Sequence, residues 1–298
     1  MASAREIQNR IKSIQETMKI TNAMFMISSS KLRKAKQKLE ETRPYFYTLQ
    51  TTIGRILRHV PDIDHAFFDE RQDVKLKDRT IGYIVVTADK GLAGSYNHNV
   101  IKLAEEHMNR APHNRLFVVG ELGRQYFSKH GYEIDTHFHY TAQQPTMHRA
   151  RIIMETLVED FLEKKLDEVY MVYTDMTSPV QSDAAFIQLL PLKKATFSIP
   201  SLPISVRQEE IVLYPDAETV LDHIVPSYIT GFIYGALVDS YSCEQNSRMM
   251  AMQTATDSAQ KMLHELSTQY NRVRQTAITQ EITEVIAGSK AQKQKVKR

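Results

Sequence analysis

The last quarter of the chain, from Ala236 to Ala287, contains no glycine and no proline, although the 298-residue sequence holds ten of each. Glycine and proline destabilise a helix interior by about 1 and 3 kcal/mol, so their absence favours one uninterrupted helix of roughly 50 residues. At about 1.5 Å per residue, such a helix is about 75 Å long. This length exceeds the width of most domains, and we expect the helix to span or project from the rest of the molecule.

Along this helix, apolar and small residues recur at intervals of three and four: Met249, Met252, Thr256, Ala259, Leu263, Leu266, Tyr270, Val273 and Ala277. That spacing keeps one face turned toward a partner helix. Thr256 and Ala259 occupy positions where a stable homodimer would carry branched aliphatic side chains. Beyond Ala277 the apolar face shifts to Ile278, Ile282, Val285 and Ile286. The pattern predicts a helix that pairs along its middle and continues alone into another environment.

The first 60 residues carry a second helical series, in which intervals of four and three alternate: Ile7, Ile11, Ile14, Met18, Thr21, Phe25, Ser28, Leu32, Ala35 and Leu39. Thr21 and Ser28 lie on this seam, as Thr256 does on the other. Two long helices with matching small or polar seam positions predict an intrachain antiparallel coiled coil. The alternative is that each helix packs separately on the globular middle of the chain.

Short apolar and β-branched runs alternate with helical patterns in the middle of the chain. Strands are predicted at Thr80–Thr87, Leu116–Val119 and Glu168–Tyr173, with an additional extended segment at Phe186–Leu192. This alternation is typical of α/β folds, so we predict a Rossmann-like α/β domain with a largely parallel sheet. The predicted organisation is an N-terminal coiled-coil helix (1–60), a linker (61–79), the α/β domain (80–215), a C-terminal coiled-coil helix (216–288) and a basic tail (289–298) that we expect to be disordered.

The composition is ordinary for a globular protein, with 42% hydrophobic residues, 24% charged residues and a net charge of +3. This mild charge favours neither nucleic acid nor a membrane surface as a partner. Cys243 is the one cysteine and excludes an internal disulfide, which is typical of a reducing compartment. No apolar run approaches the roughly 20 residues of a transmembrane helix, and the charged, amphipathic start does not resemble a cleavable signal. We expect a soluble or peripheral protein.

One loop follows a predicted strand and precedes a predicted helix, the position where phosphate-binding loops occur. Its sequence, Asp89-Lys90-Gly91-Leu92-Ala93-Gly94-Ser95, matches neither common phosphate-binding motif, because the lysine precedes both glycines. The eleven histidines show no metal-binding spacing with glutamate or cysteine, and no nucleophile–base pattern is present. The sequence therefore predicts no catalytic residue, no cofactor and no metal.

Two alternative functions each rest on a single feature. The Gly91–Gly94 loop would serve a Rossmann-like nucleotide-binding enzyme, which predicts nucleotide binding by the isolated chain. The basic run between Lys31 and Lys38 on the first helix would suit a coiled-coil protein that binds nucleic acid, which predicts salt-sensitive DNA binding. No aromatic residues interleave with this run, which argues against single-stranded nucleic acid, and a solvated helix face is the usual fate of such charges. The run consists of Lys31, Arg33, Lys34, Lys36 and Lys38.

Three blocks of the sequence resemble the gamma subunits of F-type ATP synthases, in their bacterial form. The segment that starts at Arg248, RMMAMQTATDSAQKMLHELSTQYNRVRQTAITQEITEVIAGS, resembles their C-terminal helix. The segment IQNRIKSIQETMKITNAMFMISSSKLRKA resembles their opening helix, and TADKGLAGSYN resembles the loop after the first strand of their central domain. The blocks occur in the family's order, and the resemblance covers essentially the whole chain.

This resemblance implies a non-catalytic rotor, the central stalk subunit that transmits rotation of the membrane c ring to the catalytic beta subunits in ATP synthesis and hydrolysis. In the family, the terminal helices form an antiparallel coiled coil inside a hexamer of alpha and beta subunits, and the α/β domain contacts the epsilon subunit and the c ring. The resemblance further implies one copy per complex and no nucleic-acid partner. It also implies association with the cytoplasmic face of the bacterial plasma membrane through the complex only.

The resemblance also assigns partner-contact and coupling roles by position. Met24 matches a methionine near the region where the beta subunit engages the stalk, and the loop residues that match a segment approaching an acidic beta-subunit lever are Asp89, Lys90 and Gly91. The other matches are the basic residues Lys31 and Arg33, Arg248 at the start of the C-terminal block, and Arg274, Gln275, Thr279 and Glu281 in contacts with beta-subunit loops. Ala93 and Ser95 depart from the cysteine and glycine of many bacterial members, and the cysteine-bearing insertion of the chloroplast form is absent.

Overall fold

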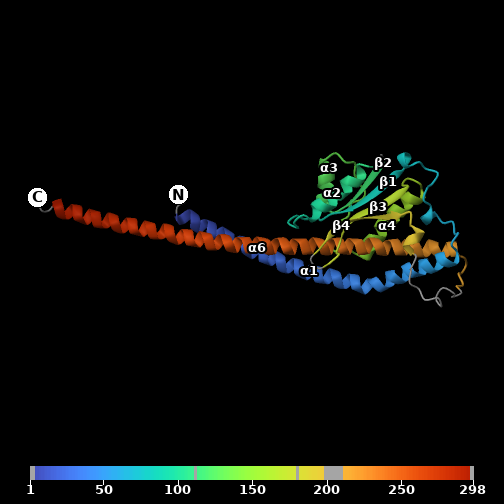
Figure 1. The fold of residues 1–298 in the computed structure, drawn as a ribbon, viewed down its shortest axis with the longest axis horizontal. Helices are drawn as coiled ribbons and strands as arrows, with labels where there is room; N and C mark the ends of the chain where they lie inside the picture. Colours follow the sequence, from blue (N-terminus) through green and yellow to red (C-terminus); the bar gives the residue numbers. More distant parts are fainter. Residues whose placement is uncertain (1–3, 111–112, 179–180, 198–210, 296–298) are drawn as a thin grey trace. The chain divides into compact units, whose positions relative to one another are not determined.

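The computed structural model describes residues 4–110, 113–178, 181–197 and 211–295, with side chains described as far as residue 289. The chain divides into two compact units. The coil unit comprises residues 1–27 and 249–298, and the sheet unit comprises residues 28–248. Two long helices, α1 (Ala4–His59) and α6 (Ala217–Lys295), contribute residues to both units (Figure 1).

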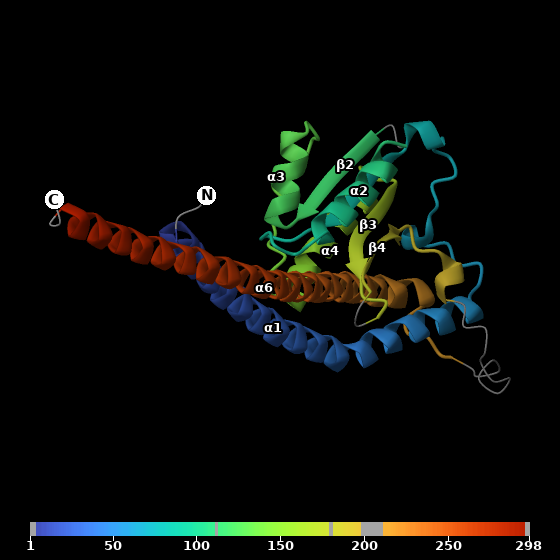
Figure 2. The ribbon, with the colours of Figure 1, turned by 60° about the vertical axis from the view of Figure 1, so that its left-hand side comes forward.

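The sheet unit is built on four strands: β1 (Thr80–Val86), β2 (His113–Val119), β3 (Glu168–Asp175) and β4 (Asp183–Leu190). Their order is β2-β1-β3-β4, and β1 is parallel to both neighbours whereas β4 is antiparallel to β3 (Figure 2). The prediction of a largely parallel sheet is therefore confirmed. The extended segment expected at Phe186–Leu192 belongs mostly to β4, which begins earlier, at Asp183.

Both faces of the sheet are covered, which explains why β1 reads as a continuous apolar run. Its alternate side chains enter different cores, with Ile84 and Val86 in one and Tyr83 and Val85 in the other. The first core is closed by α1, α6 and α4 (Met147–Leu162), and the second by α2 (Tyr96–Met108) and α3 (Glu121–Lys129). This layering confirms the predicted Rossmann-like α/β fold.

Helix α6 begins near the expected position and passes through Pro226, Gly231 and Gly235 without ending. A Cβ atom on Gly231 would lie 1.8 Å from Cδ1 of Phe46, so the missing side chain allows α1 and α6 to approach each other closely. Leu39, earlier on α1, faces Gly235, later on α6, which shows that the helices are antiparallel within the sheet unit. At its far end α6 extends to Lys295, although disorder was expected for 289–298, and 296–298 lie outside the described residues.

The coil unit contains the start of α1 and the end of α6, and its buried residues follow the predicted seam. Met252, Thr256 and Ala259 are buried on α6, and Thr21 is buried on α1. The Oγ1 atoms of Thr21 and Thr256 lie 2.7 Å apart in a buried hydrogen bond between the helices. From residue 274 to residue 289 every α6 side chain is exposed. The predicted helix pairing along the middle of the C-terminal series is therefore confirmed.

Candidate coupling interface

The residues assigned by resemblance are distributed over both units. The coil unit holds Met24, Arg274, Gln275, Thr279 and Glu281, and the sheet unit holds Lys31, Arg33, Asp89, Lys90, Gly91 and Arg248. Within the sheet unit, Arg248 contacts Lys90 and Gly91 directly, and Lys31 acts electrostatically on the ion-pair partner of Arg248. The structure thus assembles most of the second group around the loop between β1 and α2.

Arg248 joins helix α6 to that loop. Its Nη2 atom donates to the carbonyl oxygens of Lys90, at 2.8 Å, and Gly91, at 3.0 Å, and its Nε atom donates to Gly91 at 3.3 Å. Its Nη1 atom donates to Oε1 of Glu244 at 2.6 Å, one helical turn earlier. The planar guanidinium reaches two carbonyls and a carboxylate at once, which a lysine ammonium on a single stem does less well. We call this set the Arg248 joint, and because Arg248 is only 7% exposed it holds the loop in place.

Glu244 supplies the negative charge of the Arg248 joint from a buried position. Burial raises the pKa of Glu244, the Arg248 guanidinium lowers it, Asp89 raises it further, and Lys31 on α1 lowers it. A buried ion pair is strongly destabilised when one partner is removed, because the other charge is left without compensation. Lys31 therefore supports the joint from the second helix, while Arg33 lies exposed on α1.

Asp89 fixes the other side of the same loop. Its Oδ1 atom accepts a hydrogen bond from the backbone N–H of Glu121, at 3.1 Å, at the start of α3, where the helix dipole favours a negative charge. Its Oδ2 atom accepts from the backbone N–H of Gln143, at 3.2 Å, and from the hydroxyl of Thr141. The Asp89 carboxylate is thus occupied inside the sheet unit, whereas Lys90 and Gly91 are exposed.

The loop lies at the carboxyl ends of the parallel strands, where the strand order reverses between β1 and β3 and α/β sheets usually bind ligands. Helix α6 places its own residues there. Cys243 packs with Ala93 and Tyr96, and the Oγ atom of Ser240 accepts a hydrogen bond from the backbone N–H of Thr174 at 3.1 Å. Burial raises the pKa of the Cys243 thiol to about 12, so the thiol is protonated at neutral pH. The geometry favours an internal attachment of α6 over a phosphate site.

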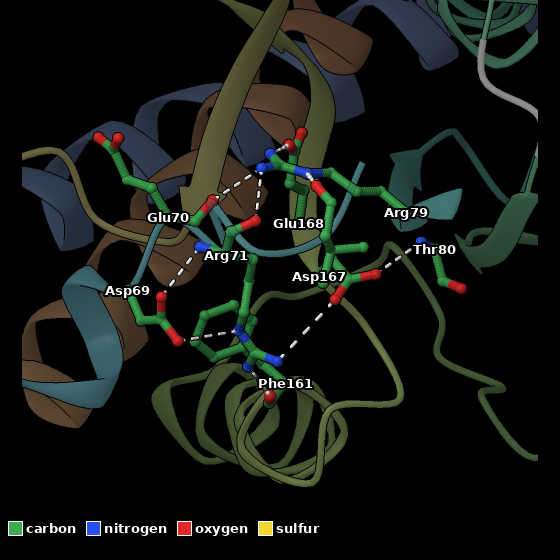
Figure 3. Close-up of polar contacts among 9 residues, drawn as sticks. Asp69, Glu70, Arg71, Arg79, Thr80, Phe161, Asp167 and Glu168 are labelled. Carbon is green, nitrogen blue, oxygen red and sulfur yellow. Dashed lines mark hydrogen bonds and ion pairs between the residues drawn. The ribbon is translucent and has the colours of Figure 1, made fainter. Parts of the chain in front are cut away.

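Sequence reasoning missed a polar network at the opposite, amino-terminal end of the sheet (Figure 3). Arg79 donates to the carboxylate of Glu168 and to the carbonyl oxygen of Arg71. Arg71 donates to the carbonyl oxygen of Phe161 at 2.7 Å, lies 4.8 Å from the centre of that ring and faces Asp167 at 3.9 Å. We call this network the arginine clamp. It fastens the linker that follows α1 to the start of β3.

No periodic pattern could have revealed the arginine clamp, because both arginines lie in a turn-like, charge-rich stretch of the linker. The linker contains two 3-10 helices, η1 (Ala66–Phe68) and η2 (Leu76–Asp78). Phe67 and Phe68 of η1 are buried in the first core. This adjacent pair of large apolar residues is the one feature of the linker from which packing on the domain could have been inferred.

The assigned residues of the coil unit lie on the surfaces of its two helices. Met24 is half-buried on α1, whereas Arg274, Gln275, Thr279 and Glu281 are exposed on α6. The Thr279 hydroxyl donates to the carbonyl oxygen of Gln275 at 2.9 Å, one turn earlier in the same helix. These α6 side chains are therefore available to a partner.

Asp239 on α6 belongs to a charged cluster contributed by three elements. Burial and the neighbouring Asp175 of β3 raise the pKa of Asp239 to about 6, while Arg43 and Lys36 of α1 act in the opposite direction.

Over the described residues, His, Cys, Asp and Glu side chains form no group of three or more that could hold a metal ion. Within those same ranges, no helix combines the length and the apolar character that crossing a membrane requires.

Comparison with known proteins places the chain among sequences of one family. A family model described as ATP synthase matches residues 3–291. The ATP synthase gamma chain of Ruminiclostridium cellulolyticum is 43% identical over 96% of this chain and 98% of its own length. That of Acetivibrio thermocellus is 43% identical over 98% of this chain and 100% of its own length. A gamma chain of Acetobacterium woodii that is described as sodium ion specific is 37% identical over 97% of this chain and 98% of its own length.

Solved structures show the same fold. The central stalk and c ring of the Tetrahymena thermophila mitochondrial ATP synthase contains a chain with a TM-score of 0.56 and 20% identity, covering 79% of this chain and 99% of that one. A chain of the Euglena gracilis mitochondrial ATP synthase has a TM-score of 0.55 and 15% identity, and the match covers 91% of this chain and 95% of that one. With relatives matched from end to end, the chain belongs to the ATP synthase gamma-chain family, whose members are non-catalytic subunits of the central stalk.

Proposed function

We propose that this chain transmits rotation from the membrane c ring of a bacterial F-type ATP synthase to the catalytic beta subunits. The observation that carries the proposal is the double attachment of the sheet. The Arg248 joint ties its carboxyl end to α6, and the arginine clamp ties its amino end to the linker of α1. Torque applied to the α/β domain would then reach α6 through the Arg248 joint and α1 through the first core, in which Ile53 and Ile56 pack with the sheet.

The assigned residues divide into two roles in this proposal. Arg248, Asp89 and Lys31 position the contact surface, because their charged groups act within the sheet unit. The exposed or half-buried residues would contact the alpha and beta subunits: Met24, Arg33, Lys90, Gly91, Arg274, Gln275, Thr279 and Glu281. A rotor that turns past successive partners benefits from such dispersed contacts, because one deep complementary contact would favour a single angular position.

The complex that this proposal implies holds one copy of the chain, inside a hexamer of alternating alpha and beta subunits. The epsilon subunit and the c ring would contact the α/β domain. The chain would lie at the cytoplasmic face of the bacterial plasma membrane, attached through the complex and not by a span of its own. It would need no cofactor and no nucleic acid.

A tagged purification from the native host tests the proposal. We expect native mass measurement to give one copy of this chain with an alpha–beta hexamer, and the eluate to hydrolyse ATP. A homodimer, or a monomer without those partners under gentle conditions, would contradict it. Nucleotide binding by the isolated chain, or DNA binding that weakens steeply with salt, would then favour the enzyme or the nucleic-acid binder instead.

A further inference from the structure

The sheet unit contains a cavity of about 300 Å³ between β4, which is an edge strand, and helix α6. This volume is at the lower end of the range of about 300–1,000 Å³ that small-molecule sites occupy. The buried part of its lining is apolar and consists of Leu189, Leu192 and Ile229. Three half-buried aromatic residues also line it: Phe186, Tyr228 and Phe232. The cavity therefore suits a hydrocarbon group.

Two hydrogen-bond donors are found among the exposed residues that line the same cavity. They are the ammonium group of Lys193 and the hydroxyl group of Thr196, at and within the 3-10 helix η3 (Lys194–Phe197). Within the described part of the chain, neither side chain forms a hydrogen bond or an ion pair. Among the described residues that line the cavity, none is acidic. The cavity thus combines an apolar interior with an uncompensated positive charge and a free hydroxyl group.

The turn that carries these donors is held in place by hydrogen bonds. The backbone N–H of Thr196 donates to the carbonyl oxygen of Lys193 at 2.9 Å, so both donors lie on one short turn. The backbone N–H of Leu192 donates to the carbonyl oxygen of Phe67 at 2.7 Å. The Nζ atom of Lys194 donates to two carbonyl oxygens of the linker, each at 3.0 Å. A site that is already formed loses less conformational freedom when a ligand binds.

We propose that this cavity binds a small amphipathic carboxylate, whose hydrocarbon chain lies between β4 and α6 and whose carboxylate pairs with Lys193 and Thr196. An ammonium group and a hydroxyl group match the charge and the acceptor atoms of one carboxylate. A phosphate group is usually bound by an arginine fork or by the N-terminus of a helix, and neither lines this cavity. The site is separate from the proposed stalk function, because none of its residues carries an assigned coupling role.

A single tryptophan can report on the cavity without background, because the sequence contains no tryptophan. Tyr228→Trp places an indole in the cavity wall, and Tyr45→Trp, at an exposed tyrosine of α1, is the matched control. The probe is octanoate that carries a bromine atom at the end of its chain, because bromine quenches indole fluorescence on contact. In the full-length chain we expect saturable quenching of Tyr228→Trp and only weak, unsaturable quenching of Tyr45→Trp.

Recognition of the carboxylate is tested in the Tyr228→Trp chain. Lys193→Met removes the ammonium group and should weaken octanoate binding about tenfold, the loss expected for a charge-assisted hydrogen bond. The same replacement should leave the binding of octanol unchanged, because octanol has the same chain and no charge. Lys129→Met, at an exposed lysine at the end of α3, is the matched control and should bind octanoate like its parent.

The unaltered chain provides a second measurement that does not depend on the folding of Tyr228→Trp. A ligand that binds only the folded state raises the melting temperature, so octanoate should raise it and acetate at the same concentration should not. Equal melting temperatures in octanoate and acetate, or equal quenching of the two tryptophan variants, would overturn the cavity site. Octanoate binding that Lys193→Met leaves unchanged would overturn recognition of the carboxylate. Each of these results would leave the stalk function standing.

Discussion

Arg248 shows how one buried side chain connects a stalk helix to the domain that turns it. Replacing Arg248 by alanine leaves the Glu244 carboxylate buried without its partner, which destabilises a protein by about 3–5 kcal/mol. The double replacement Arg248→Met with Glu244→Leu removes both charges and restores packing, so its stability should recover. Neither variant retains the hydrogen bonds to Lys90 and Gly91. We therefore expect ions pumped per ATP hydrolysed to fall in both, as measured in reconstituted vesicles.

Comparing the single and double variants separates the effect of the Arg248 joint on stability from its effect on the number of ions pumped per ATP. A double variant that unfolds at the same urea concentration as the unaltered complex, and also pumps the same number of ions per ATP, would show that the joint contributes only to folding. Arg151→Ala, which removes an exposed arginine of α4 in the same unit, controls for the loss of a positive charge.

Asp239 predicts a pH dependence with a defined sign. Burial raises the pKa of Asp239 from its ordinary value of 3.8 to about 6 in the folded chain, so the folded state binds the proton more tightly. The resulting stabilisation is present below pH 4 and is lost as the pH rises through about 6, by at most about 3 kcal/mol. Urea unfolding of Asp239→Asn should show a flatter profile between pH 4.5 and about 7. Glu155→Gln, at an exposed position on α4, should keep the original slope, and an unchanged slope in Asp239→Asn would refute the assignment.

At the scale of the helices, the threonine pair in the coil unit predicts a coupling energy. Thr21 and Thr256 are buried and share a hydrogen bond, and each hydroxyl also has a second partner, the Met18 carbonyl for Thr21 and Oδ1 of Asn22 for Thr256. A single replacement by valine removes the shared hydrogen bond while the remaining hydroxyl keeps its second partner, so we expect a loss of about 0.5–1.5 kcal/mol, and the second replacement should add less than the first. Urea unfolding of the two single variants and the double variant measures this. Strictly additive losses would mean that the hydrogen bond does not form in solution.

The contact between α1 and α6 in the sheet unit predicts opposite effects at two glycines of one helix. Alanine raises helix propensity by about 1 kcal/mol at either site. At Gly231, however, the added methyl group would overlap the Phe46 ring, and such overpacking destabilises by about 1–3 kcal/mol. At Gly235 the nearest atom, on Leu39, is 4.0 Å away. Thermal unfolding should therefore show loss for Gly231→Ala and a small gain for Gly235→Ala, and a gain at both would disprove the close approach.

Across the whole molecule, the features that could be predicted are those that repeat along the chain. The strand β1, the seams through Thr21 and Thr256 and the alternation of strands and helices all leave a periodic pattern. The arginine clamp leaves none, because Phe161 and Asp167, which Arg71 contacts, are distant in sequence, and a charged residue in a turn-like stretch is normally solvated. Continuation of α6 through Gly231 agrees with the helix predicted at 216–288, but the reason for a glycine there could not be predicted, because it is the close approach of the Phe46 ring.

The division into units also exceeds what periodicity reveals. The sequence predicted coiled-coil helices at 1–60 and 216–288, with a change of environment only beyond Ala277, yet each helix also changes environment earlier along its length. Residues 28–59 and 217–248 pack with the sheet, and the outer parts pack as a pair. The two models considered for the helices, a coiled coil and packing on the globular middle, both hold, in different stretches.

The pairing of Thr21 with Thr256 joins positions that are 235 residues apart, and this separation has a consequence during synthesis. A ribosome adds about 5–20 residues per second, so the start of α1 emerges roughly 10 to 50 s before the partner it will pair with. Until Thr256 is synthesised, the seam of α1 has no partner in its own chain. Because Thr21 and Ser28 are small and polar, the unpaired seam of α1 favours non-specific hydrophobic association less than a row of leucines would. A chain released before Thr256 cannot complete the pair, so the coil unit can form only after nearly the whole chain has been made.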